Sequence, residues 1–228
     1  MCIVCSINEV RMLSFTEENY LKAIYHLAEG GAKAVLTNEI ADSMNTKAAS
    51  VTDMIKKLSN KNFIAYEKYY GVKMTKQGKT EALSIIRKHR LWETFLVEKL
   101  QFNWDEVHDI AEQLEHIQSP LLIEKLDAFL NFPKADPHGE PIPDRYGKVQ
   151  VQAQGCLHEQ PPGYTGSIVA VKDSDSNLLK YLNKIGAIPG KKIELIGKEE
   201  YDESLDVIVE RKRLTISKAV AQNILVAV

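Results

Sequence analysis

The residues with the clearest potential for chemistry are histidines and glutamates in the middle of the chain. Four of them fall at positions i, i+4, i+7 and i+8: His108, Glu112, Glu115 and His116. In a helix with about 3.6 residues per turn, this spacing predicts that all four side chains lie on one face. His89 and Glu93 form a further i, i+4 pair. Imidazole nitrogen and carboxylate oxygen, without thiolate, suit divalent manganese or iron better than a cysteine-rich zinc site.

Metal binding is not the only interpretation of these residues. A lone His-x3-Glu pair is more often ordinary helix surface than a pair of ligands. Four such side chains on one face are difficult to explain as a core stripe, because burying carboxylates without a cation costs free energy. We therefore take the four-residue face as the stronger metal-binding signal.

Charge is distributed unevenly along the chain, although the formal net charge is only −2. Residues 43–80 contain eight lysines and two acidic residues, a balance of +6. Residues 93–131 contain nine acidic residues and two lysines, a balance of −7. Surface lysines are often merely solvated, but contacts with DNA phosphates need lysine or arginine, and these lysines coincide with a helix-turn-helix pattern. The basic segment therefore predicts a DNA-binding surface.

Length and composition exclude several classes of protein. The chain has 228 residues, 44% hydrophobic and 26% charged, unlike disordered or collagen-like sequences. No apolar run approaches the roughly 20 residues that span a bilayer, and no export signal is visible. Three cysteines, Cys2, Cys5 and Cys156, are too few for a disulfide framework. We expect a cytoplasmic protein with no membrane partner.

The order of predicted elements is that of a winged helix-turn-helix, followed by more helices and a β-rich segment. Helices are expected at about 16–28, 37–44, 46–59, 76–99, 104–117, 120–130 and 178–185. Strands are expected at 63–67, 72–75, 168–171, 192–196, 206–209 and 214–217. Residues 132–145 contain four prolines, which cannot continue a helix and suggest a linker.

Several stretches resemble the DtxR/MntR family of metalloregulators. They are EENYLKAIY at 17–25, NTKAASVTDMIKKL at 45–58, RKHRLWETFL at 87–96, VHDIAEQLEH at 107–116 and DPHGEPIP at 136–143. The resemblance covers nearly the whole chain from about residue 14, and the C-terminal part is similar to the SH3-like, FeoA-type domain of longer members. It implies a homodimeric repressor that binds a palindromic operator in double-stranded DNA when metal is bound.

The fold class expected from this resemblance and from the predicted elements is α+β. Residues 1–11 are expected to be a disordered extension, and residues 12–75 a winged helix-turn-helix DNA-binding domain. Residues 76–131 are expected to form a helical metal-binding and dimerisation domain, and residues 132–146 a proline-rich linker. Residues 147–228 are expected to form a small SH3-like β-barrel.

The resemblance implies a first metal site that uses His89, Glu93 and His108. In the family, the SH3-like domain often adds a carboxylate or amide ligand to this site. Asp173 lies in the corresponding region of this sequence, at a shorter spacing.

The resemblance implies a second site that uses Glu112, Glu115 and His116 with a ligand from the first helix. Asn19 stands where relatives carry aspartate or methionine, and it offers a neutral carbonyl oxygen. Lys22 replaces a carboxylate of the short manganese-sensing members, and Glu112 replaces a cysteine of the iron-sensing members. We expect Mn(II) first and Fe(II) second, with Zn(II) or Co(II) binding in vitro because affinity generally follows the Irving–Williams order.

The recognition helix predicted at 46–59 supplies most of the expected DNA contacts. The candidates are Thr46, Lys47, Ala49, Ser50, Thr52, Lys56 and Lys57 on this helix, and Lys68 and Lys73 on the wing. Ala49 and the Thr52 methyl can touch thymine methyl groups, and Ser50 can reach phosphate or base edges. The tip Tyr69-Tyr70 can reach the backbone or the minor groove.

Three other functions remain open from the sequence. A winged-helix regulator that senses an organic ligand would bind its operator without metal. A metal-dependent hydrolase would need an open coordination position, and the sequence has no H-E-x-x-H motif or nucleophile elbow, so we expect no enzyme. A structural dimerisation adaptor with a degenerate metal site is kept open by Asn19.

Overall fold

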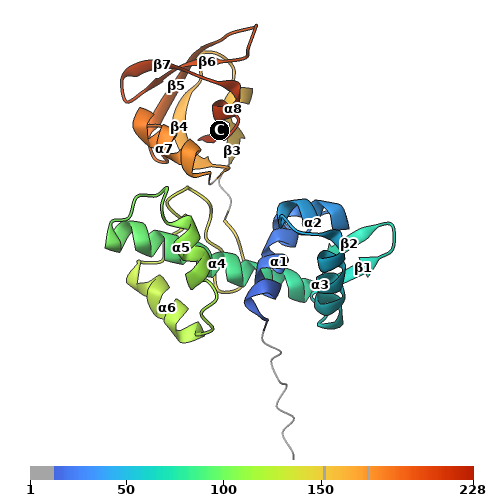
Figure 1. Cartoon of the computed structure of the whole chain (residues 1–228). Helices are drawn as coiled ribbons and strands as arrows, with labels where there is room; N and C mark the ends of the chain where they lie inside the picture. Colours follow the sequence, from blue (N-terminus) through green and yellow to red (C-terminus); the bar gives the residue numbers. More distant parts are fainter. Residues whose placement is uncertain (1–12, 151–152, 174) are drawn as a thin grey trace, which may run out of the picture. The chain divides into compact units, whose positions relative to one another are not determined.

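The computed structural model describes residues 13–150, 153–173 and 175–228 (Figure 1). The extension expected at 1–11 lies outside these residues. Contacts divide the chain into two compact units, one ending at Ile86 and the other beginning at Arg87. The long helix α4 (Lys76–Leu100) therefore contributes to both. Among the described residues, no helix is long and apolar enough to cross a membrane.

The first unit consists of helices and a β-hairpin. Its elements are α1 (Phe15–Leu27), α2 (Thr37–Ser43), α3 (Ala48–Asn60), β1 (Ile64–Glu67) and β2 (Gly71–Met74). The strands are antiparallel, with Ile64 opposite Met74. Figure 1 shows the turn between them projecting beyond the helices. The helices share a core that includes Leu21, Ile40 and Leu58, as their apolar stripes predicted. The winged helix-turn-helix is confirmed.

An ion pair between the buried Glu17 and Lys61 joins α1 to the end of α3. Ser14 and Glu17 form a capping box, in which the Ser14 amide donates to Glu17 Oε2 at 2.7 Å. The Lys61 ammonium lies 2.7 Å from Glu17 Oε1. Burial raises the pKa of Glu17, but the hydrogen bonds from Lys61 and Ser14 outweigh it and lower the pKa below its usual value.

The second unit begins with a helical part, made of the end of α4, α5 (His108–Leu114) and α6 (Pro120–Phe129). Its core includes Leu91, Val107 and Ile123. The α5 helix is shorter than the predicted helix at 104–117. Trp104 precedes the helix and packs in the core of the β-rich part, and α5 ends where Glu115 forms the C-cap.

The β-rich part of this unit is a six-stranded antiparallel sheet in the order β3-β8-β4-β5-β6-β7. The strands are β3 (Gln154–Cys156), β4 (Thr165–Val171), β5 (Lys192–Lys198), β6 (Leu205–Val209), β7 (Lys212–Ile216) and β8 (Ile224–Ala227). Between the strands lie the 3-10 helix η1 (Leu157–Glu159) and the α-helices α7 (Ser176–Ile185) and α8 (Lys218–Ala221). The sequence did not predict β3, which has no apolar run, or β8, whose apolar run is too short to distinguish strand from helix.

The proline-rich segment at 132–146 packs against the helical part and is not a free linker. Asp136, His138 and Ile142 in it are all at most 7% exposed. Arg87 of α4 donates to the Pro143 carbonyl at 2.7 Å. Prolines prevent helix formation, as predicted, but they do not prevent a segment from being buried.

Candidate metal centre

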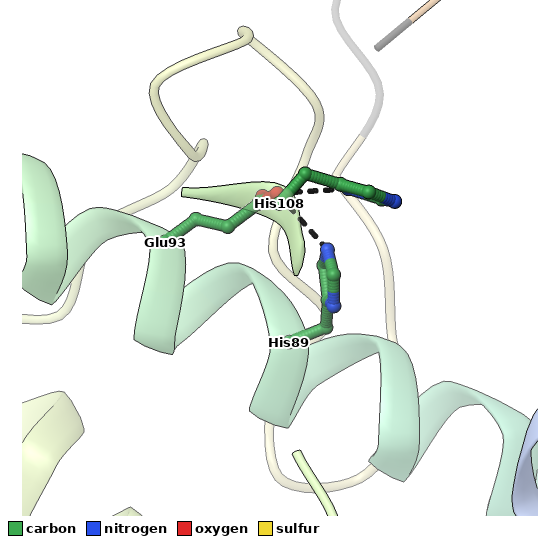
Figure 2. A group of neighbouring side chains, drawn as sticks. All are labelled: His89, Glu93 and His108. Atoms are coloured by element: carbon green, nitrogen blue, oxygen red, sulfur yellow. Dashed lines mark hydrogen bonds and ion pairs between the residues drawn. The ribbon is translucent and has the colours of Figure 1, made fainter. Parts of the chain in front are cut away.

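Glu93 of α4 lies among imidazole rings and is only 2% exposed. Its Oε1 is 2.9 Å from His89 Nε2 and 3.3 Å from His108 Nδ1. Its Oε2 is 3.6 Å from His138 Nδ1. Figure 2 shows the side chains of His89, from α4, and His108, from the start of α5, meeting at the Glu93 carboxylate. One carboxylate therefore faces three imidazoles.

The electrostatics of Glu93 favour its charged form. Burial raises the pKa of Glu93, but hydrogen bonds with His108, His138 and His89 outweigh burial and hold the pKa well below its usual range. Among the described residues, His89, Glu93 and His108 can each place one ligand atom within 4.8 Å of the others. The structure thus brings together the three residues of the first predicted site.

A second cluster shares Glu93 and adds Asp136 and His138, and all three residues are buried. Asp136 Oδ1 accepts hydrogen bonds from the amides of His138 and Glu140, at 2.8 and 3.0 Å. In the described part of the chain, Asp136 Oδ2 is buried without a hydrogen-bond partner. Arg90 Nε lies 3.5 Å from this oxygen, as an ion pair.

The His138 ring is oriented in the way typical of metal ligands. Its Nε2 is 2.8 Å from the carbonyl oxygen of Trp104. A carbonyl can only accept, so Nε2 carries a hydrogen and Nδ1 is the atom directed at Glu93. Metal-bound histidines commonly hold their second nitrogen on a backbone carbonyl in this manner.

The pKa values in this cluster are set by burial and by charged neighbours, among them Arg90, which lowers the pKa of Asp136. Burial, followed by the charge of Glu93, raises the pKa of Asp136 to about 7. Burial lowers the pKa of His138, but the Glu93 carboxylate and Asp136 outweigh it and raise the pKa to about 9. The metal-free cluster therefore retains protons that a divalent cation can replace. Nitrogen and oxygen donors in this number fit such a cation.

The second predicted site is not assembled in the same way. Glu115 is fully buried, and its Oε2 lies 2.6 Å from His89 Nδ1, so His89 stands between Glu93 and Glu115. Glu112 Oε1 is 4.0 Å from His108 Nε2. His116 is 8% exposed. Within residues 13–150, 153–173 and 175–228, no cluster of metal-binding groups joins Glu112, Glu115 and His116.

Of the four side chains predicted to share one helical face, the last lies beyond α5. The α5 helix ends at Leu114, Glu115 forms its C-cap, and His116 lies beyond the helix. Glu115 still has helical backbone angles, and its amide donates to the Ala111 carbonyl at 2.8 Å, so helical spacing relates His108, Glu112 and Glu115. Glu115 is aimed at α4 through His89.

Two ligand candidates remain, Asn19 and Asp173, and among the described residues Asp173 belongs to neither cluster. Asn19 belongs to the first unit, where its Oδ1 is buried with no hydrogen-bond partner among the described residues. Asp173 is exposed, and its Oδ1 accepts from the Asp175 amide at 2.9 Å.

Sequence reasoning missed Asp136 and His138 as site residues. They lie in the proline-rich stretch that was assigned to a linker, where no helical periodicity marks them. The available signal was the Asp-x-His pattern itself, two potential ligands in a stretch that was otherwise used only as evidence of family resemblance.

The side chains predicted to contact DNA are all exposed. They are Thr46, Lys47, Ala49, Ser50, Thr52, Lys56, Lys57, Lys68 and Lys73. Two have internal partners: Thr52 donates to the Ala48 carbonyl at 2.9 Å, and Lys56 pairs with Asp53 at 3.2 Å. At the wing tip, Lys68 lies 5.0 Å from the ring centre of Tyr69, which is 85% exposed.

The sequence matches three family models in succession along the chain. Residues 12–72 match the N-terminal DNA-binding domain of iron-dependent repressors. Residues 75–144 match the metal-binding and dimerisation domain of the same repressors. Residues 156–228 match the FeoA domain. The winged helix and the histidine–carboxylate centre thus define a metal-dependent regulator that binds DNA.

Individual relatives agree with this class. The chain is 32% identical to the iron-dependent repressor IdeR of Mycobacterium tuberculosis over 190 residues, which cover 78% of this chain and 82% of that protein. It is 33% identical over 119 residues to the regulator MntR of Oceanobacillus iheyensis, covering 52% and 80%. A solved manganese-dependent repressor in complex with manganese matches with a TM-score of 0.84 and 33% identity, covering 92% of this chain and 99% of that one. The chain belongs to the DtxR/MntR family of metal-dependent transcriptional repressors.

Proposed function

We propose that this protein is a repressor that binds palindromic operators when Mn(II), or secondarily Fe(II), occupies the centre around Glu93. The observation that carries the proposal is a charged, buried carboxylate facing three imidazoles, next to an Asp136 oxygen without a hydrogen-bond partner among the described residues. Leaving such groups without a cation is costly in a buried environment.

We propose Glu93, His89 and His108 as one ligand set, and Glu93, Asp136 and His138 as another. A divalent cation supplies positive charge and directional bonds to oxygen and nitrogen. Glu93 Oε1 faces the first set and Oε2 faces His138, so each oxygen serves one side. Trp104 holds the His138 ring through its carbonyl. Asn19, Glu112, Glu115, His116 and Asp173 remain proposed ligands on the strength of the family resemblance.

The preference for Mn(II) over Fe(II) is supported by the absence of a thiolate donor and by glutamate, in place of cysteine, at position 112. Named relatives include both iron-dependent and manganese-dependent repressors, and one related structure holds Cd(II) and another Zn(II). We expect Zn(II) or Co(II) to bind in vitro as well.

The proposed operator contacts are the exposed candidates on α3 and on the wing. We propose that a homodimer presents two such surfaces to two half-sites about one helical turn apart. The α6 helix leaves Leu121, Leu122 and Phe129 between 40% and 65% exposed, and an apolar surface of this kind suits a second copy of the chain.

Fluorescence anisotropy tests this function. The probe is DNA from upstream of the protein's own gene and of neighbouring metal-transporter genes, at fixed salt because phosphate contacts make affinity salt-dependent. We expect binding with Mn(II), binding with anaerobic Fe(II), and none with chelator. Equally tight binding in chelator would favour a regulator of another ligand and would refute the metal switch.

His116→Ala, which removes one proposed ligand, is the variant to measure in the same assay. We expect a folded dimer whose operator binding no longer responds to metal. Full retention of the response would refute the assignment of His116 as a ligand.

A further inference from the structure

Arg90 is a buried cation on α4 that the proposed function does not use. It is 9% exposed. One terminal nitrogen donates to the Pro141 carbonyl at 2.6 Å, and the other donates to Glu140 Oε2 at 2.5 Å. Its Nε lies 3.5 Å from Asp136 Oδ2. The planar guanidinium thus contacts three residues of one short segment, 136–141.

This segment is a tight turn that carries two proposed ligands. The Asp136 amide donates to the Glu140 carbonyl at 3.0 Å, and the Asp136 carboxylate caps the turn from inside. These bonds fix the shape of the turn but do not fix it to α4, where Glu93 lies. Arg90, three residues before Glu93 and therefore on a neighbouring position of the same helix, supplies hydrogen bonds to α4.

We infer that Arg90 is a positioning residue of the metal centre, which clamps the 136–141 turn on α4 so that Asp136 and His138 face Glu93. This inference rests on the proposed metal-binding function. Arg90 itself touches no metal in this account.

A simpler role for Arg90 would have the opposite effect. A cation beside Asp136 repels a metal ion, so its removal would tighten metal binding if charge alone mattered. The contacts favour the clamp: the two short hydrogen bonds go to Glu140 and Pro141, whereas Asp136 Oδ2 is not hydrogen-bonded to Arg90. Arg90 Nε also lies 3.5 Å from Asp136 Oδ2 as an ion pair, so the clamp reaches the Asp136 carboxylate, and a metal ion would share this oxygen with the guanidinium.

The test is Mn(II) affinity of the full chain by calorimetric titration, for Arg90→Met and Arg90→Lys. We expect both to bind about 10–100-fold more weakly than the wild type, the range typical when a group that orients metal ligands is removed. Lysine should not rescue, because it keeps the charge but not the fork of donors. Arg145→Met is the matched control, since Arg145 is exposed and contacts Tyr146, and it should bind like the wild type.

Two further readouts separate positioning from general destabilisation. The visible spectrum of the Co(II)-loaded protein should change in Arg90→Met because ligands are lost, and amides 136–141 should exchange faster with deuterium. If Arg90→Met does not fold in chelator, Glu140→Gln loosens the same clamp from its 41% exposed end and should weaken binding several-fold.

Mn(II) binding as tight as wild type, or tighter, in Arg90→Met would overturn the inference, as would full rescue by lysine. If the Arg90 variants do not fold, wild-type Mn(II) affinity in Glu140→Gln would overturn the inference. Failure of the proposed function looks different, because the wild type itself would then bind no Mn(II).

Discussion

Two aspartates in the proline-rich segment have the same local hydrogen bonds and opposite electrostatic properties. Asp136 Oδ1 accepts from the amides of His138 and Glu140, and Asp144 Oδ1 accepts from those of Tyr146 and Lys148. Asp136 is buried, and burial with the charge of Glu93 raises its pKa to about 7. Asp144 is exposed, and hydrogen bonds from the Lys148 and Tyr146 amides lower its pKa.

The comparison shows that the turn motif alone does not make a metal ligand. Each aspartate uses one oxygen to cap its turn. The second oxygen of Asp136 is shut off from water without a hydrogen-bond partner among the described residues, whereas Asp144 lies at the surface. A cation is needed only where burial has removed the solvent, so the function follows from packing.

Glu93→Gln should have the largest effect. It removes the charge shared by both ligand sets while keeping the shape of the side chain. We expect Mn(II) affinity to fall by more than about 100-fold, beyond the range for groups that only orient ligands. Calorimetric titration measures this. A variant within tenfold of wild type would show that the centre does not depend on Glu93.

Gly139→Ala tests whether the 136–140 turn is held tightly. Gly139 has a φ of +84°, and an added Cβ would lie 1.9 Å from the Val169 carbonyl oxygen. We expect the free energy of unfolding to fall by about 2–4 kcal/mol, from left-handed strain and overpacking together. Gly163→Ala is the control, because its φ is +89° but nothing lies within 4 Å, and about 1–2 kcal/mol is expected. Equal losses in urea denaturation would contradict the tight packing of this turn.

Asp136→Asn and Asp144→Asn test the comparison directly. Both substitutions keep an oxygen to cap the turn, but Asp136→Asn removes the charge next to the metal. We expect Mn(II) affinity to drop about 10–100-fold for Asp136→Asn and to change less than about twofold for Asp144→Asn. Similar affinities for the two variants would mean that burial does not distinguish these aspartates.

Glu17→Gln extends the comparison to a buried carboxylate whose ionic partner is a lysine, Lys61. The pKa of Glu17 in the folded protein is lowered below its ordinary, unfolded value of 4.5. Its stabilisation is therefore present above pH 4.5 and is lost as the pH falls through the folded pKa. We expect Glu17→Gln to lose about 1 kcal/mol at pH 7, with the difference closing in acid, and to leave Mn(II) affinity unchanged. Urea denaturation across pH 3–7 measures this, and a loss that is independent of pH would contradict it.

The sequence predicted the elements with strong periodicity, and it pointed to candidate ligands that lie on them. His89 and Glu93 are one turn apart on α4, as their spacing required. It could not predict that Glu115 ends α5 and turns toward His89, because a helix end depends on packing, here the packing of the residues around it. It could not predict Asp136 and His138 either, because irregular segments have no period and their burial is decided by the tertiary fold.

The most direct test of the account is anomalous X-ray diffraction from crystals grown with Mn(II). The account predicts an anomalous peak within bonding distance of the Glu93 carboxylate. Imidazole nitrogens from His89 and His108, or from His138, should complete the coordination of the metal ion. A fully occupied peak elsewhere, with Glu93 still hydrogen-bonded to His89 and His108, would contradict it.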